Sequence, residues 1–197
     1  MVMQDTLIND WLERMERQQP GQCGHAERVA IYGMALGQKL GLSSDDLQQL
    51  RWGLLLHDIG KLGVPDAIIR HPGKLSAKEW GYVMQHPTHG DTFLGDQVGT
   101  ELLRTVVRCH HERWDGDGYP RGLKGAEIPL FGRIAAICDT WDCLLSDRAY
   151  SPAFTVGEAV AELRRCMGTQ FDPTLVNTFL SMSARLVDIP CFVEHYS

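Results

Sequence analysis

The spacing of apolar residues constrains the fold of this chain more than any other feature. Apolar side chains recur every three or four residues through most of the sequence, and runs that alternate apolar and polar residues are hard to find. The first pattern is typical of an amphipathic helix, whereas the second would indicate a half-buried strand. The sequence therefore predicts an all-α fold, with helices near residues 5–19, 24–40, 44–58, 77–85, 88–95, 99–111, 131–146, 155–167 and 173–184.

Helix caps and turn residues support this division. Ser43 stands ahead of two aspartates and an apolar-periodic run, and Ser76 with Glu79 matches a capping box. The stretches 59–75 and 112–130 are rich in Gly and Pro, and we interpret them as ordered loops. Because no linker composition or repeat separates two halves, we expect a single domain over residues 1–197, with a core over about 22–185, a short N-terminal helix and a C-terminal tail.

Composition excludes several classes of protein. The six cysteines are scattered without a CxxC pair, which favours reduced thiols over a disulfide framework. A net charge of −6 disfavours binding to DNA or RNA, because a phosphate backbone demands a basic face. No apolar run approaches the roughly 20 residues of a membrane span, and the N-terminus lacks the pattern of a secretory signal. We therefore expect a cytoplasmic protein without a membrane or polymeric nucleic acid as partner.

Two adjacent pairs of metal-ligating residue types are the strongest chemical signal. His57 and Asp58 follow a largely apolar run, which delivers a polar pair to an interior or a cleft, where a buried charge needs a partner. His110 and His111 form the second pair, directly ahead of a glycine-punctuated loop. With three further candidates, the set comprises five histidines and two aspartates: His25, His57, Asp58, His86, His110, His111 and Asp139.

This donor set predicts a class of chemistry. Nitrogen and oxygen ligands in this mixture suit iron, manganese or zinc and are poorly suited to magnesium alone. Seven ligands exceed one tetrahedral site, but they suit two ions about 3.5–4 Å apart, where a bridging hydroxide attacks the substrate. The natural reaction of such a pair is phosphoester hydrolysis. His89, three residues after His86, competes with it as a ligand on geometry alone.

Five segments occur in the order found in one known family. They are LLHDIGKLGVPD at 55–66, HPGKLS at 71–76, HHERWDGDGYPRGLKGAEIP at 110–129, DTWDCLLSDRAY at 139–150 and GTQFDP at 168–173. On these motifs the chain resembles the HD-GYP family of the HD superfamily of metal-dependent phosphohydrolases. The resemblance covers about His25 to Phe179. It implies a helical HD-domain bundle with an ordered GYP loop, and hydrolysis of a bacterial cyclic dinucleotide, chiefly cyclic di-GMP.

The resemblance also implies roles for individual residues. It assigns metal ligation to the same seven residues and favours His86 over His89. Asp58 and Lys61 are expected to be catalytic, and three side chains to contact the substrate: Lys61, Tyr119 and Arg148. The GYP loop is expected to shape the substrate site through Asp115, Gly116, Gly118, Tyr119 and Pro120. Asp142, nearly one helical turn after Asp139, is expected to orient a ligand or to hold Arg148, and Asp115 to brace the loop.

Two departures from the family pattern refine the expected activity. Some family members bind a third metal through a carboxylate one turn ahead of the first histidine, where this chain has Gly21. Glycine has no side chain that can ligate, so we predict two divalent ions, iron or manganese, and opening of the ring to the linear dinucleotide pGpG. Ser151 replaces a basic residue often found after the arginine, which removes one expected phosphate contact.

Two other functions are compatible with the sequence. One is a non-catalytic or weakly active signalling module that binds diguanylate cyclases or other partner proteins, a role that the resemblance also allows. The other is an HD phosphohydrolase of other nucleotides, which the HD core favours and the GYP loop does not. Because none of the seven ligands is missing, we expect an enzyme.

Overall fold

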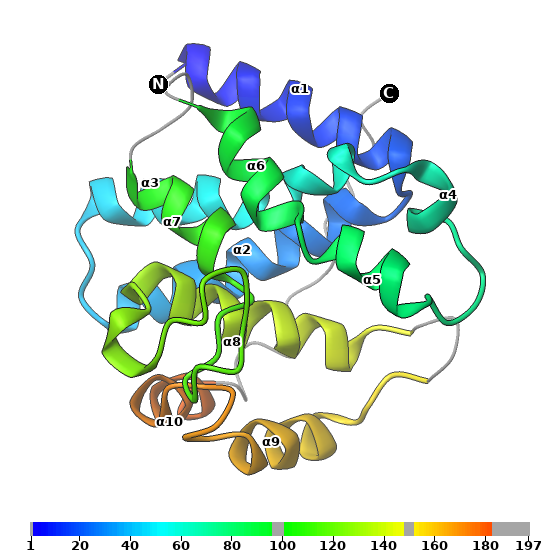
Figure 1. Ribbon diagram of the computed structural model, residues 1–197. Coiled ribbons are helices and arrows are strands. Elements are labelled where there is room, and N and C mark those ends of the chain that lie inside the picture. Colours follow the sequence, from blue (N-terminus) through cyan, green and yellow to red (C-terminus); the bar gives the residue numbers. More distant parts are fainter. Residues whose placement is uncertain (1, 96–100, 148–151, 183–197) are drawn as a thin grey trace.

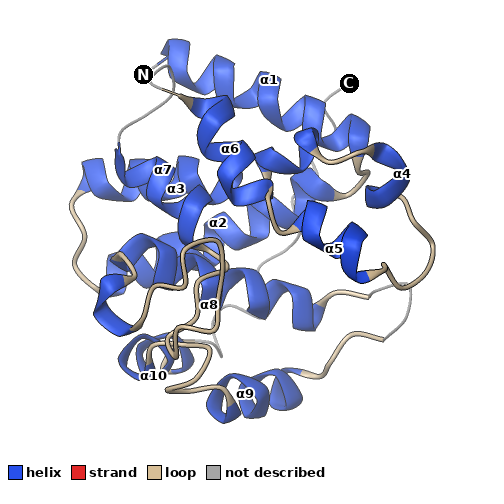
Figure 2. Cartoon of the chain, viewed as in Figure 1, coloured by secondary structure: helices blue, strands red, loops and turns tan. Residues whose placement is uncertain are grey.

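The fold is helical, as the apolar spacing predicts. The structure, a computed structural model, describes residues 2–95, 101–147 and 152–182. Within these ranges there is no strand, and the β-type pairing consists of one isolated bridge between Met167 and Phe171 (Figure 2). Within the same ranges, no helix combines the length and the hydrophobicity needed to cross a lipid bilayer.

Ten α-helices and two short 3₁₀ helices make up the described chain. In order they are α1 (Val2–Gln18), α2 (Gln22–Lys39), α3 (Ser44–Leu55), η1 (Ile59–Gly63), α4 (Asp66–Ile69), α5 (Ala77–Val83), α6 (His86–Leu94), α7 (Glu101–Cys109), η2 (Gly125–Glu127), α8 (Leu130–Leu145), α9 (Val156–Arg165) and α10 (Pro173–Leu180).

The predicted caps are present. The Ser43 hydroxyl accepts from the backbone N–H of Asp46 at the start of α3, and Ser76 with Glu79 forms the complete capping box of α5. Gly41 has φ 79°, a left-handed conformation that suits the turn after α2. Thr155 and Glu158 form a further capping box at α9, a Thr-x-x-Glu signal of the same kind.

One expectation about the loops was wrong. The third helix ends at Leu55, within a few residues of its predicted end, but residues 59–75 are not a plain loop, because they contain η1 and α4. The reason is a close approach between η1 and α6. A Cβ on Gly60 would lie 1.8 Å from the carbonyl oxygen of His86, so only glycine fits there. This contact places the His57–Asp58 pair beside the first residue of α6.

The core surrounds α8. Its inward side chains, among them Ile134, Ile137 and Trp141, have almost no exposed surface. Figure 1 shows α8 crossing the molecule below α2, with α1 at the top and α9 and α10 at the bottom. Helices α2 and α7 both pack on α8, α3 packs on α2 and α7, and α6 packs on η1 and α7. One continuous buried cluster joins these elements, and the candidate site opens on one side of it.

The described cysteines are free thiols, as expected from their spacing. They are Cys23, Cys109, Cys138, Cys143 and Cys166. Cys191 and the C-terminal tail lie outside the described residues, as do Arg148 and Ser151.

Candidate metal centre

All seven predicted ligands converge on one site from five separate parts of the chain. They are contributed by α2 (His25), the turn between α3 and η1 (His57, Asp58), the start of α6 (His86), the turn after α7 (His110, His111) and α8 (Asp139). Their ligand atoms fall into overlapping groups, each with all its atoms within 4.8 Å of one another. The structure therefore brings together residues that are up to 114 positions apart.

Main-chain hydrogen bonds orient three of the imidazoles. In each case Nδ1 donates to the carbonyl oxygen three residues earlier, at the end of a helix: His57 to Leu54 (2.7 Å), His86 to Val83 (2.7 Å) and His110 to Val107 (3.0 Å). Because a carbonyl oxygen can only accept, Nδ1 must carry the proton in these rings. In the neutral ring, Nε2 then presents a lone pair to the site, as a metal ligand does.

The facing nitrogens fit a cation. Nε2 of His86 lies 3.1 Å from Nε2 of His110, and both atoms present lone pairs, so no hydrogen bond forms between the neutral rings. Burial lowers the pKa of both groups, since it disfavours the charged form, and this favours the neutral rings. Two lone pairs at this distance repel each other unless a positive charge lies between them. The donor set therefore fits a metal ion on grounds of its own chemistry.

Asp58 is shared by two groups of ligands. Its Oδ1 lies 3.3 Å from Nε2 of His86 and 3.8 Å from Nε2 of His110, in a group that also includes His111. Its Oδ2 lies 3.4 Å from Nε2 of His57, on the side where His25 stands. A carboxylate with one oxygen toward each group could serve as a ligand for an ion held by either group.

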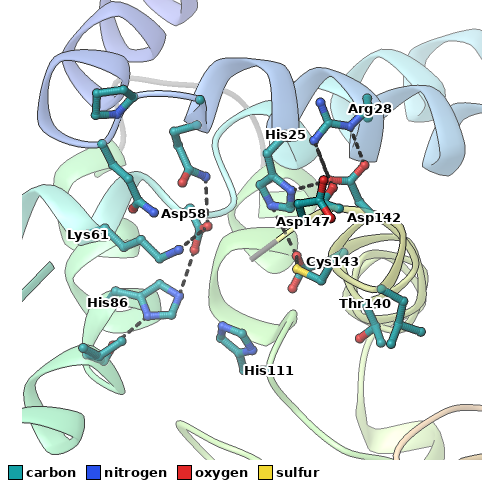
Figure 3. A pocket seen from close by; sticks show the side chains of 18 of the residues that line it. His25, Arg28, Asp58, Lys61, His86, His111, Thr140, Asp142, Cys143 and Asp147 are labelled. Carbon is teal, nitrogen blue, oxygen red and sulfur yellow. Dashed lines mark hydrogen bonds and ion pairs between the residues drawn. The ribbon is translucent and has the colours of Figure 1, made fainter. Parts of the chain in front are cut away.

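Lys61 and Gln22 complete the surroundings of this carboxylate. The Lys61 ammonium donates to Asp58 Oδ2 at 2.6 Å, and the buried Gln22 amide donates to the same oxygen at 3.0 Å. Burial opposes ionisation of Asp58, but the charge of Lys61 and the interactions with His57 and His86 together outweigh it and hold the pKa of this carboxyl well below its usual range. Figure 3 shows Lys61 and His86 directed at Asp58 from the same side of the site.

Asp142 orients the first histidine. Its Oδ2 accepts from Nδ1 of His25 at 2.8 Å, and both its oxygens accept from Arg28, Oδ1 from Nε at 2.7 Å and Oδ2 from Nη2 at 2.9 Å (Figure 3). Asp142 thus orients a predicted ligand, and among the described residues the arginine that it holds is Arg28. His25 thereby turns Nε2 toward Asp139 Oδ1, at 3.3 Å.

Two of the histidines have pKa values shifted in opposite directions. Burial would lower the pKa of His25, but hydrogen bonds with Asp139 and Asp142 outweigh it and raise the value to about 9. Burial lowers the pKa of His111 to about 4, because it disfavours the charged form of the ring. Without metal, His25 is therefore charged at neutral pH and His111 is not.

These shifts predict how the stability of the metal-free protein depends on pH. The contribution of His25 is fully present below its ordinary pKa of 6.5 and is lost as pH rises through about 9. His111 acts in the other direction. Between pH 6.5 and about 4 its ring is protonated in the unfolded chain but neutral in the folded protein, so stability falls as pH falls through this range. We expect the free energy of unfolding, measured by urea titration in chelator, to be greatest near pH 6.5. A His71→Gln variant, at an exposed histidine, should keep the same profile, and an unchanged stability from pH 4 to 9 would contradict the prediction.

A cavity of about 980 Å³ opens beside the ligands. Its wall includes Lys61, Tyr119 and Asp139, and aromatic side chains on α5 and ahead of α9, Trp80 and Phe154, also line it. Trp80 is 49 % exposed and Phe154 40 % exposed, although both are large apolar groups. The cavity thus combines charged groups with exposed aromatic faces, a combination that suits a ligand with phosphates and flat rings.

The loop at 112–124 is braced by a carboxylate that the sequence analysis missed. Glu112 is buried, and its two oxygens accept from the backbone N–H groups of Arg121 (2.8 Å) and Leu123 (2.9 Å). Gly118 folds back onto this segment, and a Cβ there would lie 2.3 Å from the backbone nitrogen of Arg113. The loop is therefore held from inside at its base.

A second set of bonds holds the outer part of the loop. Asp115 forms a two-point ion pair with Arg113, at 2.6 Å for its shorter contact, and accepts from the backbone N–H of Asp117. The backbone N–H groups of Trp114 and Asp115 donate to the carbonyl oxygens of Gln170 and Thr169. These contacts are those expected of a residue that braces the loop. Tyr119 then stacks on His111, with ring centroids 4.8 Å apart, and lines the cavity.

Some predicted site residues lie elsewhere. His89 packs against Gly63 and belongs to no cluster of metal-ligating atoms among the described residues, so the geometry favours His86. Arg148 lies outside the described residues, and its phosphate-binding role stays a prediction. Sequence reasoning missed Gln22, Arg28 and Glu112. Glu112 stands next to the paired histidines, which was a usable signal, whereas the partners of Gln22 and Arg28 are 36 and 114 residues away.

The family follows from a direct comparison. A model of the HD domain matches residues 9–175, which is most of the chain. The chain belongs to the HD domain family. The matched region contains the His57–Asp58 pair and all its predicted partner ligands. The family indicated by the motifs is confirmed.

Two curated relatives of this chain are named as phosphodiesterases of cyclic dinucleotides. The HD domain described here is 37 % identical over 171 residues to a cyclic di-GMP phosphodiesterase of Thermotoga maritima, covering 84 % of this chain and 45 % of that protein. It is 39 % identical over 169 residues to 3′3′-cGAMP-specific phosphodiesterase 3 of Vibrio cholerae, covering 86 % and 37 % respectively. The chain thus spans less than half the length of these curated relatives.

A solved structure supports the fold. The HDG"Y"P protein Bd1817 from Bdellovibrio bacteriovorus superposes on this HD domain with a TM-score of 0.68, over 83 % of this chain and 52 % of that one. At 20 % sequence identity, the likeness shows that the two proteins share the helical HD fold.

Proposed function

We propose that this HD domain is a metal-dependent phosphodiesterase that hydrolyses cyclic di-GMP to the linear dinucleotide pGpG. The observation that carries the proposal is the position of Asp58, with one carboxylate oxygen toward each of two ligand groups. Two divalent ions bound there, iron or manganese, would supply an activated water and stabilise the charge that builds on the phosphate. Asp58 and its six partner ligands would hold these ions.

Other residues of the chain would bind and orient the substrate. Lys61 lies at the cavity wall with its ammonium beside Asp58, where it could also approach a phosphate oxygen. Tyr119 is fixed against His111 and lines the same cavity, so its phenol could contact a phosphate or a base. Trp80 and Phe154 offer exposed rings on which bases could stack. Arg148 is proposed as a phosphate ligand on the family motif.

The named relatives support the substrate class rather than a single substrate. One is named for cyclic di-GMP and the other for 3′3′-cGAMP, both of them cyclic dinucleotides. Because these relatives are longer than this chain, their activities enter here as part of the proposal. Cyclic di-GMP is favoured on the resemblance of the five motifs.

The deciding experiment is hydrolysis by protein that has been purified without oxygen and loaded separately with iron or manganese. Cyclic di-GMP, 3′3′-cGAMP and a linear nucleotide such as ppGpp are offered side by side, and products are resolved by chromatography. We expect linear pGpG from cyclic di-GMP, no reaction in an Asp58→Ala variant, and two metal ions per chain. Complete breakdown to GMP with three ions would contradict the role given to Gly21.

The two other functions that fit the sequence correspond to distinct outcomes. Turnover of ppGpp without turnover of a cyclic dinucleotide would indicate a phosphohydrolase of other nucleotides. Binding of cyclic di-GMP or of a diguanylate cyclase, without turnover under either metal, would indicate a signalling module. Either result would overturn the proposed activity.

A further inference from the structure

Cys143 lies in the candidate metal centre although no motif assigns it there. It follows Asp139 by four residues on α8, so the two side chains lie on the same helical face, and both line the cavity. The cysteine sulfur, a carboxylate oxygen of Asp139 and a ring nitrogen of His25 lie within 4.8 Å of one another. In Figure 3 the yellow sulfur of Cys143 is seen next to His25.

Two distances within this trio match those between ligands of one ion. Sγ of Cys143 lies 3.5 Å from Asp139 Oδ1, and Nε2 of His25 lies 3.3 Å from the same oxygen. A tetrahedral ion with bonds of about 2.3 Å to sulfur and about 2.0–2.1 Å to nitrogen or oxygen separates these ligand pairs by about 3.6 and 3.4 Å. Asp139 Oδ1 therefore stands near ligand spacing from both other atoms, and the sulfur and the ring nitrogen of His25 lie within 4.8 Å of each other.

Another cysteine shows what an ordinary thiol contact looks like in this chain. Cys23 donates to the backbone carbonyl oxygen of Leu12 at 3.2 Å, and it belongs to no cluster of metal-ligating atoms among the described residues. Of the described cysteines, Cys143 is the one that falls in such a cluster. Cys166 also contacts the carboxylate four residues earlier, that of Glu162 at 3.6 Å, so the feature that distinguishes Cys143 is the ring nitrogen of His25 beside the same carboxylate.

We propose that Cys143 is a ligand, through its sulfur, of the ion that His25 and Asp139 would hold. The inference rests on the proposed metal centre and adds to it. The S–H proton leaves to solvent as the metal–sulfur bond forms, so uptake of the metal releases a proton. The two halves of the centre then differ in character. The half built from His86, His110 and His111 offers nitrogen and oxygen, whereas the other half also offers sulfur.

The difference has a consequence for the choice of metal. Thiolate ligands favour zinc and iron over manganese, which prefers oxygen donors. We therefore expect the Cys143 half to retain a thiophilic ion in the presence of competing manganese. Replacing Cys143 by alanine should weaken zinc binding at least about tenfold, the smallest loss that even an outer-shell partner causes, and should change manganese binding much less.

Cobalt(II) gives the test a readout other than activity. The full chain is purified without oxygen, stripped with chelator and titrated with Co²⁺, while absorption is recorded in the visible and near-ultraviolet. Visible bands report cobalt held by the protein, and a sulfur-to-cobalt band in the near-ultraviolet reports a thiolate ligand. Cys143→Ala and Cys143→Ser are compared with Cys23→Ala, which removes a half-buried thiol that belongs to no cluster of metal-ligating atoms among the described residues.

We expect the near-ultraviolet band in the wild type and in Cys23→Ala, and its loss in both Cys143 variants with the visible bands retained. Cobalt bound with visible bands but without the sulfur band would overturn the role of Cys143 and leave the proposed function standing. A sulfur band that persists in Cys143→Ala would also overturn it. If the wild type takes up no cobalt, zinc or manganese, both the proposed function and this inference fail.

Discussion

Replacing Asp58 by asparagine is expected to lower turnover of cyclic di-GMP at least about 10³-fold, because the ions would lose their shared ligand. Metal ions contribute several kcal/mol to the stabilisation of transition-state charge, and each 1.4 kcal/mol or so is tenfold in rate. Asparagine keeps the size of the buried side chain and an oxygen that can still accept from Gln22. The variant therefore changes mainly the charge at the centre, and the measurement is kcat/KM with iron or manganese.

A matched variant separates this effect from general damage. Asp66→Asn removes an exposed carboxylate at the start of α4, where the Asp66 side chain accepts from the Gln18 amide. This variant should keep wild-type turnover. Metal content and circular dichroism of Asp58→Asn are recorded alongside. A folded Asp58→Asn protein that binds both ions and turns over within tenfold of the wild type would rule out a bridging role for Asp58.

Glu112→Ala is expected to lower the free energy of unfolding by about 3 kcal/mol, because two part-buried backbone N–H groups lose their bonds to a buried, charged acceptor. Those groups, at Arg121 and Leu123, donate to the two oxygens of the Glu112 carboxylate. The same change should lower kcat/KM, since the loop that carries Tyr119 would lose its inner brace. Urea denaturation of the metal-free protein measures the first effect, and steady-state kinetics of the metal-loaded protein measure the second.

The chain offers a control within the same loop. Glu127 is exposed and accepts from a single backbone N–H, that of Lys124 (3.0 Å), so Glu127→Ala should cost much less stability than Glu112→Ala. Glu112→Gln keeps one acceptor oxygen and should fall between the wild type and the alanine variant. Equal stabilities of Glu112→Ala and Glu127→Ala would show that the buried carboxylate does not hold the loop.

The helices and the ligands could be predicted from sequence because each has a local cause. Apolar spacing and caps such as Ser76 with Glu79 are set by neighbours three or four residues away. The seven predicted ligands stand out by residue type, since an aspartate such as Asp58 or Asp139 in an otherwise apolar helical run needs a cation. Their convergence on one site could be expected for the same reason.

What the sequence did not reveal depends on contacts between distant segments. Residues 59–75 were interpreted as a loop from their Gly and Pro content, although Gly60 is required by the approach of α6 rather than by a turn. Gln22 and Arg28 are ordinary helix residues until the fold brings them to Asp58 and Asp142. Cys143 was counted with the other scattered thiols, because only the packing of α2 against α8 brings it toward His25.

The anchoring of three imidazoles to helix-end carbonyls affects how the family can vary. The oxygens at Leu54, Val83 and Val107 belong to the main chain, so no side-chain substitution at these positions can delete them. The apolar residues at these positions can therefore be substituted while the three imidazole rings keep their orientation. Substitutions in the cavity wall can therefore change its shape, and with it the substrates that fit, while the predicted ligands keep their orientation.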